Sequence, residues 1–522
     1  MKRIILSLLS LTTTLAMAQH DNQAPKYADM ITENGLREKL TILSGADMEG
    51  RETASPGQKK AAAYIESQFK RFGLLPGNNG SYQMLYPVYQ DELTAEKLSI
   101  NGTAFVWDRD YSISLNNISS GSWTYTSVIF VGYGVVDSVN NINDYTGLDV
   151  KGKLVVVLDG NAPGRPADPA PAGGARGRGP RGGPSSAFAK SAAARKAGAA
   201  ALVIISANFP LATPTETKGR MSLTPAAATN AIPFPIVNAS ASVGSALLGK
   251  VGTAPSDFQD VAKGDHNVNV TISATRTNQV LESSNVIGLL PGTDKKDEYV
   301  FLTGHYDHLG KRGNVIWYGA DDDGSGSVSV IQMAEAFSKA AREGHGPRRS
   351  IVFMTVSGEE KGLLGSQYYS EHPVFPLDKT TVDLNTDMDG RIDTERKLGD
   401  TLNYIYVIGH DKLSSDLPVI NEAMNNKYTK LTLDYKYDDP TDQNRIYYRS
   451  DHYNFAKKGV PILFFYDGML LADYHKPTDT IEKINFPLMQ KRVQLVFYTA
   501  WEMANRDDML KRDTPLNMPN SR

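Results

Sequence analysis

Residues 299–308 read YVFLTGHYDH, an apolar β-like run that ends at Gly304 and is followed at once by histidines and an aspartate. The pattern returns at 351–360, IVFMTVSGEE, where the apolar run ends in two glutamates. Between the two runs, residues 325–341 have helical spacing. Strands that alternate with helices predict an α/β layer fold with a mostly parallel sheet, and such sheets bind ligands at the carboxyl ends of their strands. We therefore expect the functional residues at those ends.

Acidic residues cluster at two of these positions. The segment GADDDGSG at 319–326 puts three aspartates at the start of the predicted helix, where they repel one another unless a cation is present. Two adjacent glutamates after a buried strand indicate a division of labour, because one carboxylate can hold a metal while its neighbour acts as a general base. Segments 385–389 and 473–475 add a further acid and a late histidine.

Two histidines and three carboxylates from these segments form a donor set that suits Zn²⁺. They are His305, Asp322, Glu360, Asp387 and His475. Two divalent ions, three ligand carboxylates and one bridging hydroxide would sum to zero charge. A hydrolase with two metal ions is the simplest interpretation.

The composition excludes several kinds of partner and of chemical site. The chain has 522 residues, 41% of them hydrophobic and 22% charged, which predicts a folded protein of two to four domains. A net charge of −3 gives no reason to expect nucleic acid or an anionic membrane as the main partner. The count of zero cysteines excludes disulfides, thiolate metal sites and cysteine nucleophiles, so His, Asp and Glu must hold any metal.

The first 18 residues have the pattern of a secretory signal peptide. Lys2 and Arg3 precede an apolar run over 4–15, and Ala16-Met17-Ala18 forms a cleavage site of small residues. No later apolar run is long enough to anchor the chain in a bilayer. We expect a protein secreted to the periplasm or the medium, without a stable membrane anchor after cleavage.

Five motifs, in this order, resemble a known family: HYDHLG, GADDDGSG, SGEEKGLLGS, NTDM and YHKPTDT. They are similar to those of the co-catalytic zinc exopeptidases, which include bacterial leucyl aminopeptidases, aminopeptidase Y and the glutamate carboxypeptidases. The resemblance spans 266–505 and the lead-in segment 43–65. It implies a three-layer catalytic domain formed by 19–117 and 266–522.

The segment between these two parts resembles a different domain. Its strands and its alanine-rich helix are similar to the protease-associated domain that members of this family often contain as an insertion. We expect this β-rich insertion over 118–265, interrupted by a mobile Arg/Gly/Pro-rich loop at 162–186.

The resemblance also implies a role for each candidate metal ligand. His305, Asp322 and Asp387 would hold one zinc ion, and Asp322, Glu360 and His475 would hold the other. Asp322 and a water or hydroxide would bridge the two ions.

Two further roles come from the same resemblance. Glu359 would be the general acid and base, and the Tyr474 hydroxyl would stabilise the oxyanion. This chain departs from the family at Asp323, where Asn is often found, and the departure adds a charge beside the bridging ligand.

The expected reaction is metal-assisted hydrolysis of peptides by an aminopeptidase that binds the free α-amine near Glu359 and Asp387. One alternative is a carboxypeptidase, in which Arg445 and Arg449 would bind the substrate carboxylate, or a dipeptidase. The other is a non-hydrolytic relative, either a binding module that lost its zinc or an acyltransferase similar to glutaminyl cyclases. A serine hydrolase is excluded, because the consecutive residues 450–452 cannot converge as a triad. The preferred side chain, the metal loaded in the cell, the oligomeric state and the role of the insertion stay open.

Overall fold

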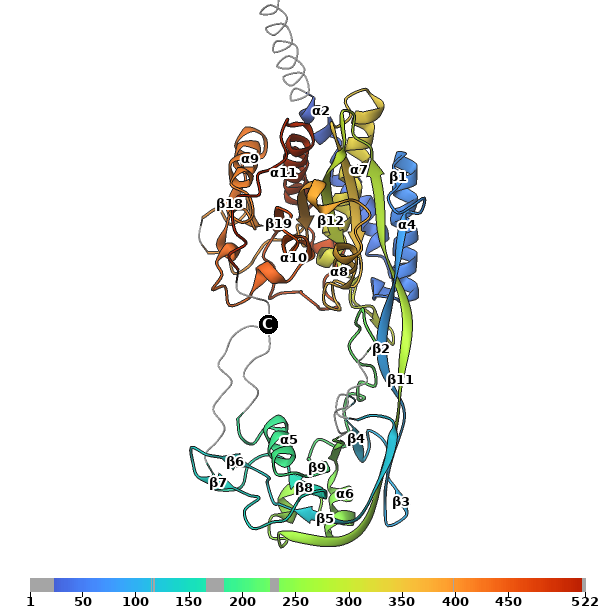
Figure 1. Cartoon of the computed structure of the whole chain (residues 1–522), viewed down its shortest axis with the longest axis vertical. Coiled ribbons are helices and arrows are strands. Elements are labelled where there is room, and N and C mark those ends of the chain that lie inside the picture. Colours follow the sequence, from blue (N-terminus) through green and yellow to red (C-terminus); the bar gives the residue numbers. More distant parts are fainter. Residues whose placement is uncertain are drawn as a thin grey trace, which may run out of the picture. The chain divides into compact units, whose positions relative to one another are not determined.

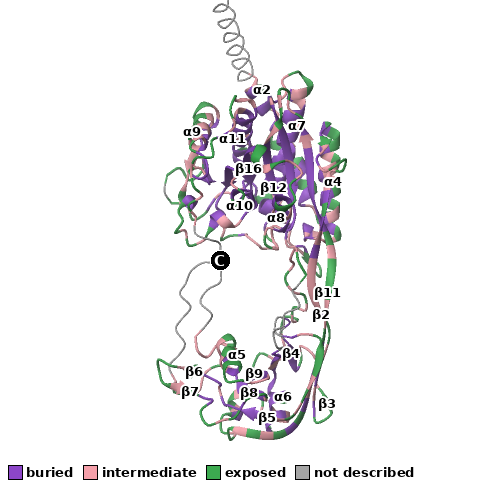
Figure 2. Ribbon diagram, in the orientation of Figure 1, coloured by how far each residue is buried: buried purple, intermediate pink, exposed green. Residues whose placement is uncertain are grey.

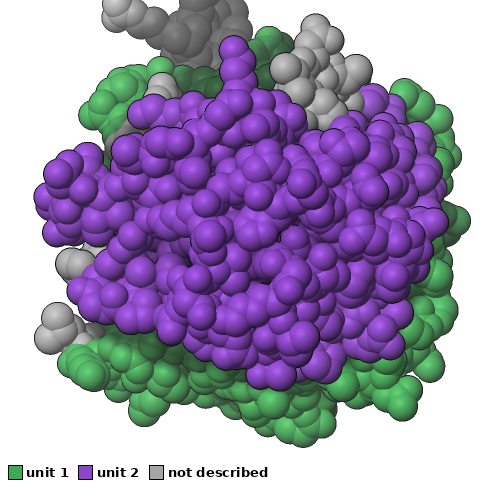
Figure 3. All heavy atoms as spheres, turned by 90° about the horizontal axis from the view of Figure 1, so that it is seen from below, with its two compact units in different colours: residues 1–88, 281–522 green, residues 89–280 purple. Residues whose placement is uncertain are grey.

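The computed structural model describes residues 23–113, 115, 118–165, 183–225, 234–397 and 399–518. The predicted signal peptide and most of the loop predicted at 162–186 lie outside the described residues. The chain divides into two compact units, unit 1 with residues 1–88 and 281–522 and unit 2 with residues 89–280 (Figure 3).

The unit boundaries differ from those expected at 117/118 and 265/266. Strands β2 (Gln83–Ile100) and β11 (Gly264–Leu290) each continue without a break from one unit into the other. Because each boundary falls inside a strand, no turn locates it.

Unit 1 contains a mixed sheet in the order β18-β17-β19-β16-β12-β15-β11 (Figure 1). The central strands are parallel, β12 with β15 and β16, and β16 with β19, whereas β11 and β17 join it antiparallel. Their bounds are β12 Lys295–His305, β15 Arg349–Val356, β16 Thr380–Thr386, β17 Tyr404–Ile408, β18 Thr432–Asp434 and β19 Ile462–Tyr466. The predicted α/β fold with a mostly parallel sheet is confirmed.

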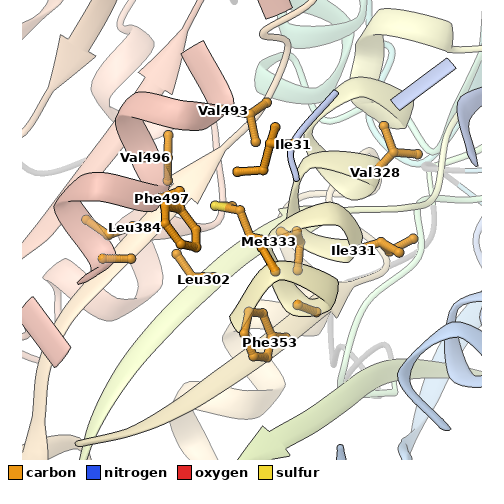
Figure 4. Packing of buried hydrophobic residues seen from close by; sticks show 14 of the residues in the cluster. Ile31, Leu302, Val328, Ile331, Met333, Phe353, Leu384, Val493, Val496 and Phe497 are labelled. Carbon is orange, nitrogen blue, oxygen red and sulfur yellow. The ribbon is translucent and has the colours of Figure 1, made fainter. Parts of the chain in front are cut away.

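Alternate residues of the central strands face two different cores. Leu302 and Leu384 pack in one cluster with Met333 of α7 (Gly326–Arg342) and Phe497 of α11 (Phe486–Asn505) (Figure 4). Phe301 belongs to the cluster on the other face, with residues of α8 (Leu364–Glu371) and α10 (His452–Ala456). Two helical layers therefore cover the sheet, and Figure 2 shows β12 and β16 buried between them.

The helices of unit 1 begin and end where local residues favour it. In α4 (Pro56–Phe72), Ser55 caps the N-terminus by accepting from the Gln58 backbone N–H, and Gly73 ends the helix at a φ of 83°. The helices are α2 Ala24–Ala28, α3 Glu33–Leu43, α4 Pro56–Phe72, α7 Gly326–Arg342, α8 Leu364–Glu371, α9 Asp416–Met424, α10 His452–Ala456 and α11 Phe486–Asn505.

Unit 2 contains a second run of strands in the order β11-β5-β8-β9-β10-β4. Its inner strands β5, β8, β9 and β10 are parallel to one another, and alternate side chains of β8 and β9 supply two apolar clusters. Its bounds are β3 Thr103–Ala104, β4 Tyr111–Ile113, β5 Gly121–Phe130, β8 Leu154–Leu158, α5 Ala187–Lys196, β9 Ala201–Ile205, β10 Ile236–Ala239 and α6 Ala241–Leu248. In the described part of the chain, no helix combines the length and the apolar character that crossing a bilayer requires.

Candidate active site

The predicted site residues lie where strands of unit 1 end. His305 is the last residue of β12, Glu359 follows β15, and Asp387 follows β16. Because β12 is parallel to β15 and to β16, these three ends meet at one edge of the sheet. Asp322 lies in the turn that leads into α7, and His475 lies in the loop after β19.

One group of donors surrounds the His305 imidazole. Its Nε2 lies 3.3 Å from Asp322 Oδ1, 3.6 Å from Asp387 Oδ1 and 3.8 Å from Glu359 Oε2. Its Nδ1 lies 3.0 Å from the backbone oxygen of Asp307, which fixes the plane of the ring. The Asp307 side chain lies farther away, with Oδ1 3.6 Å from the same nitrogen, so the contact is made mainly by its main chain.

A second group surrounds His475. Its Nε2 lies 3.2 Å from Asp322 Oδ2 and 3.0 Å from Glu360 Oε2. Asp322 thus turns one carboxylate oxygen toward each histidine. The structure brings together the five residues expected to hold metal, in the two groups that the resemblance implies.

The geometry and the unpaired atoms of this cluster fit zinc. Ligands at zinc's usual bond lengths lie roughly 3.3 to 3.6 Å apart in a tetrahedron, close to the separations found here. Within the described residues, His305 Nε2, Asp322 Oδ2 and Glu360 Oε1 are buried and have no hydrogen-bond partner. Buried polar atoms are almost always partnered, so these atoms require a further group.

Without metal, burial and the short distances between these charged groups shift their pKa values. Burial opposes the charged form of His475, but Asp322 and Glu360 outweigh it and raise its pKa to about 10. Burial acts likewise on His305, and Asp387 with Glu359 raises its pKa well above the usual value. For Glu359, burial itself raises the pKa far above that of a solvated glutamate.

Asp323, the acid that departs from the family pattern, accepts hydrogen bonds from backbone N–H groups. Its Oδ2 accepts from the His305 N–H at 3.0 Å, and its Oδ1 accepts from the N–H groups of Gly326 and Met388. It also lies within ligand reach of His305 and Asp387. Because its oxygens already accept three backbone hydrogen bonds, the arrangement favours Asp322 as the ligand.

Arg51 is a supporting residue that the sequence analysis did not single out. Its fully buried guanidinium donates to the carbonyl oxygens of Leu43, Tyr306, Tyr318 and Gly319. It therefore ties the loop after β12 to the turn that contains Asp322. Nothing in the pattern around residue 51 distinguishes a buried arginine from a surface one.

A pocket opens beside the metal-ligand cluster. Arg449 contributes to its wall and donates from Nη2 to the Tyr474 phenol oxygen at 2.9 Å. The lining residues are Asp322, Glu359, Asp387, Met388, Ile446, Arg449, Phe464, Tyr466, Leu470 and Tyr474. Arg445 is not among them, and its guanidinium stands over the Tyr448 ring.

The consecutive residues Ser450, Asp451 and His452 do not form a triad. Ser450 accepts from Asn385, Asp451 accepts from the Ser366 hydroxyl, and the His452 ring bonds the Tyr447 backbone oxygen. Each side chain has a separate partner, which agrees with the exclusion of a serine hydrolase.

Known proteins share this sequence region. A model of peptidase family M28 matches residues 285–500. A protein named "Probable leucine aminopeptidase" from Trichophyton verrucosum is 31% identical over 222 residues, which cover 41% of this chain and 56% of that protein. A "Vacuolar membrane protease" from Aspergillus clavatus is 33% identical over 137 residues, 23% of this chain and 13% of that protein. The chain spans about half the length, or less, of these relatives.

Solved structures share the fold. The aminopeptidase from Aneurinibacillus sp. strain AM-1 aligns with a TM-score of 0.52 and 20% identity, covering 96% of this chain and 100% of that one. A zinc aminopeptidase from Bacillus subtilis aligns with the same TM-score and identity, covering 93% and 99%. The strand ends and the metal-ligand cluster lie within residues 285–500, the part of the chain that the model of peptidase family M28 matches.

Proposed function

We propose that this protein is an exported aminopeptidase with two zinc ions that removes N-terminal residues from peptides. The observation that carries the proposal is the Asp322 carboxylate, which turns one oxygen toward His305 and the other toward His475 beside an open pocket. The M28 match and the aminopeptidase names of several relatives support it.

The ligands follow from the two groups of donors. One zinc ion would be held by His305, Asp322 and Asp387, and the other by Asp322, Glu360 and His475. When bound, such ions polarise the scissile carbonyl and lower the pKa of a shared water.

Glu359 is the proton carrier in this proposal. Its carboxylate lines the pocket, and its backbone N–H donates to Asp307 Oδ1 at 3.2 Å, which helps to hold the residue in place. Oε2 takes a proton from the attacking water and then delivers it to the leaving amine. A carboxyl whose pKa is raised by burial is suited to both halves of that transfer.

Tyr474 stabilises the developing oxyanion through its hydroxyl. The phenol oxygen already accepts from Arg449, so its own proton is available to the substrate. The nearby guanidinium also makes the phenol a stronger donor to negative charge.

The pocket favours substrates with an apolar first residue. Met388, Ile446, Phe464 and Leu470 provide apolar wall, while Glu359 and other carboxylates supply negative charge for an α-ammonium group. A carboxypeptidase would instead need a cation directed at the substrate carboxylate, and Arg449 Nη2 is engaged by Tyr474.

Export and the inserted unit belong to the same proposal. Residues 1–18 would direct secretion to the periplasm or the medium. Unit 2, with its parallel inner strands over 128–130, 154–158, 201–205 and 236–239, would be a domain of the protease-associated type.

The test is hydrolysis of free and N-blocked aminoacyl-arylamides by the purified mature protein, before and after chelation and zinc restoration. We expect turnover of free-amine substrates only, loss on chelation and recovery with zinc. Cleavage of C-terminal residues from N-blocked peptides would replace the aminopeptidase with a carboxypeptidase. A protein that binds no zinc would overturn the proposal altogether.

A further inference from the structure

His308 is a buried histidine beside the metal-ligand cluster to which the proposed function gives no role. Its side chain is 0% exposed. Within the described residues, neither ring nitrogen has a hydrogen-bond partner. An unpaired imidazole in a dry site costs free energy that a bound ligand would recover.

The Nδ1 atom of His308 faces the second group of donors. It lies 2.8 Å from Glu360 Oε1 and 3.9 Å from Asp322 Oδ2, and both of those oxygens also lack a hydrogen-bond partner. The His308 ring is nearly perpendicular to that of His475, with centroids 6.0 Å apart. Nδ1 of His308 and one oxygen each of Asp322 and Glu360 lie within 4.8 Å of one another, and His475 Nε2 contacts the same two carboxylates.

The contact between His308 Nδ1 and Glu360 Oε1 is short, but its geometry is not that of a hydrogen bond. The His308 ring also packs closely against Gly319. A Cβ at Gly319 would lie 2.5 Å from His308 Cγ, so only glycine fits at position 319 beside this imidazole.

We propose that His308 is a further zinc ligand, through Nδ1, at the position held by Asp322, Glu360 and His475. The inference rests on the proposed function, because it concerns the same pair of ions. That position then has four protein donors, as closed zinc sites have, whereas the position at His305, Asp322 and Asp387 keeps room for water and substrate. The closed position fills first, and the open one exchanges its metal more readily.

The test is to load the metal-free mature protein with ¹¹³Cd and record ¹¹³Cd–¹H correlation spectra, in which ring protons of coordinating histidines couple to the metal. We expect three coupled imidazoles, those of His305, His308 and His475. Two coupled imidazoles would overturn this inference and leave the proposed function intact. No coupled imidazole would overturn the proposed function as well.

Variants identify the third imidazole. His308→Asn and His308→Leu should each lose one coupled ring and weaken the tighter step of a zinc titration against a competing chelator by about tenfold or more. His452→Gln is the matched control, since His452 is equally buried in the same unit but bonds the Tyr447 backbone oxygen. Three coupled imidazoles in His308→Asn would assign the signal to another histidine and reject the proposal.

Discussion

Arg449 donates a hydrogen bond from Nη2 to the phenol oxygen of Tyr474 at 2.9 Å. The guanidinium is largely buried, and burial opposes its charge, but Tyr474 and neighbouring groups hold its pKa above the usual value. The positively charged Arg449 guanidinium therefore lies next to the Tyr474 hydroxyl that would bind the oxyanion.

Tyr474→Phe should lower kcat by about 10² to 10³, the usual cost of losing one oxyanion donor, and leave zinc content unchanged. Arg449→Met should also lower kcat, because it acts through the same hydroxyl. The double variant should then be little worse than Tyr474→Phe alone. Steady-state kinetics measure kcat and metal analysis measures the zinc content, with Arg445→Met as the control. Fully additive losses in the double variant would show that Arg449 does not act through the Tyr474 hydroxyl.

Glu359→Gln should retain both zinc ions and lose about 10² to 10⁴ of kcat, because the amide cannot carry the proton. Its neighbour is the natural control. Glu360→Gln should lose metal as well as activity, since its carboxylate contacts His308 and His475. A Glu359→Gln enzyme with normal kcat would eliminate Glu359 as the base.

The sequence predicted the parts of this site that follow from strand ends. His305 and Glu359 follow apolar runs and Asp387 follows a β-like run, and parallel pairing brings such positions to one edge of the sheet. His308 lies in the same motif, but nothing in the spacing distinguishes a buried donor from a surface histidine. Asp323 looked like an extra charge at the ligand position, because backbone acceptors are visible only once the chain is folded.

The unit boundaries depend on packing that the chain makes only when folded. β2 and β11 pass from one unit to the other as unbroken strands, so no turn separates the compact units. Pro87 and the polar residues 275–279 lie near the two boundaries, but both lie inside strands, so neither marks the end of an element.

Zinc should stabilise the protein through Asp322. Chelation should lower the Tm of the wild type, because a ligand that binds only the native state stabilises it by mass action. Asp322→Ala should reduce the rise in Tm that zinc gives to the wild type, because it removes a donor from both zinc positions. Calorimetry checks both proteins, and a variant whose Tm rises with zinc as much as that of the wild type would contradict the bridging assignment.

Zinc affinity should rise with pH. In the metal-free protein, His475 has a pKa of about 10 and His305 a raised pKa, so both imidazoles are protonated at neutral pH. Zinc binds only the neutral ring, so loading releases these protons, and each contributes about tenfold in affinity per pH unit below its pKa. Calorimetric titration in two buffers of different ionisation enthalpy measures the release. Equal affinities at acidic and alkaline pH would contradict it.

Asp479 should set the position of Asp322 without touching substrate. Its Oδ2 accepts the backbone N–H groups of Asp321 and Asp322 at 3.0 and 3.1 Å, which links the loop of His475 to the bridging carboxylate. Asp479→Asn keeps one acceptor oxygen but removes the negative charge and the second oxygen, and in Asp479 that second oxygen also accepts from the Asp321 N–H. We expect zinc affinity to fall by about 10- to 100-fold while kcat at saturating zinc stays near that of the wild type.

Asp400→Asn is the matched control for this variant, because the exposed Asp400 also accepts two backbone N–H groups, in a loop that contributes no metal donor. It should leave zinc affinity unchanged. If the two variants weaken zinc binding equally, the effect of Asp479 is general destabilisation. If Asp479→Asn lowers kcat at saturating zinc as far as Glu359→Gln does, Asp479 acts in the chemical step and not through Asp322.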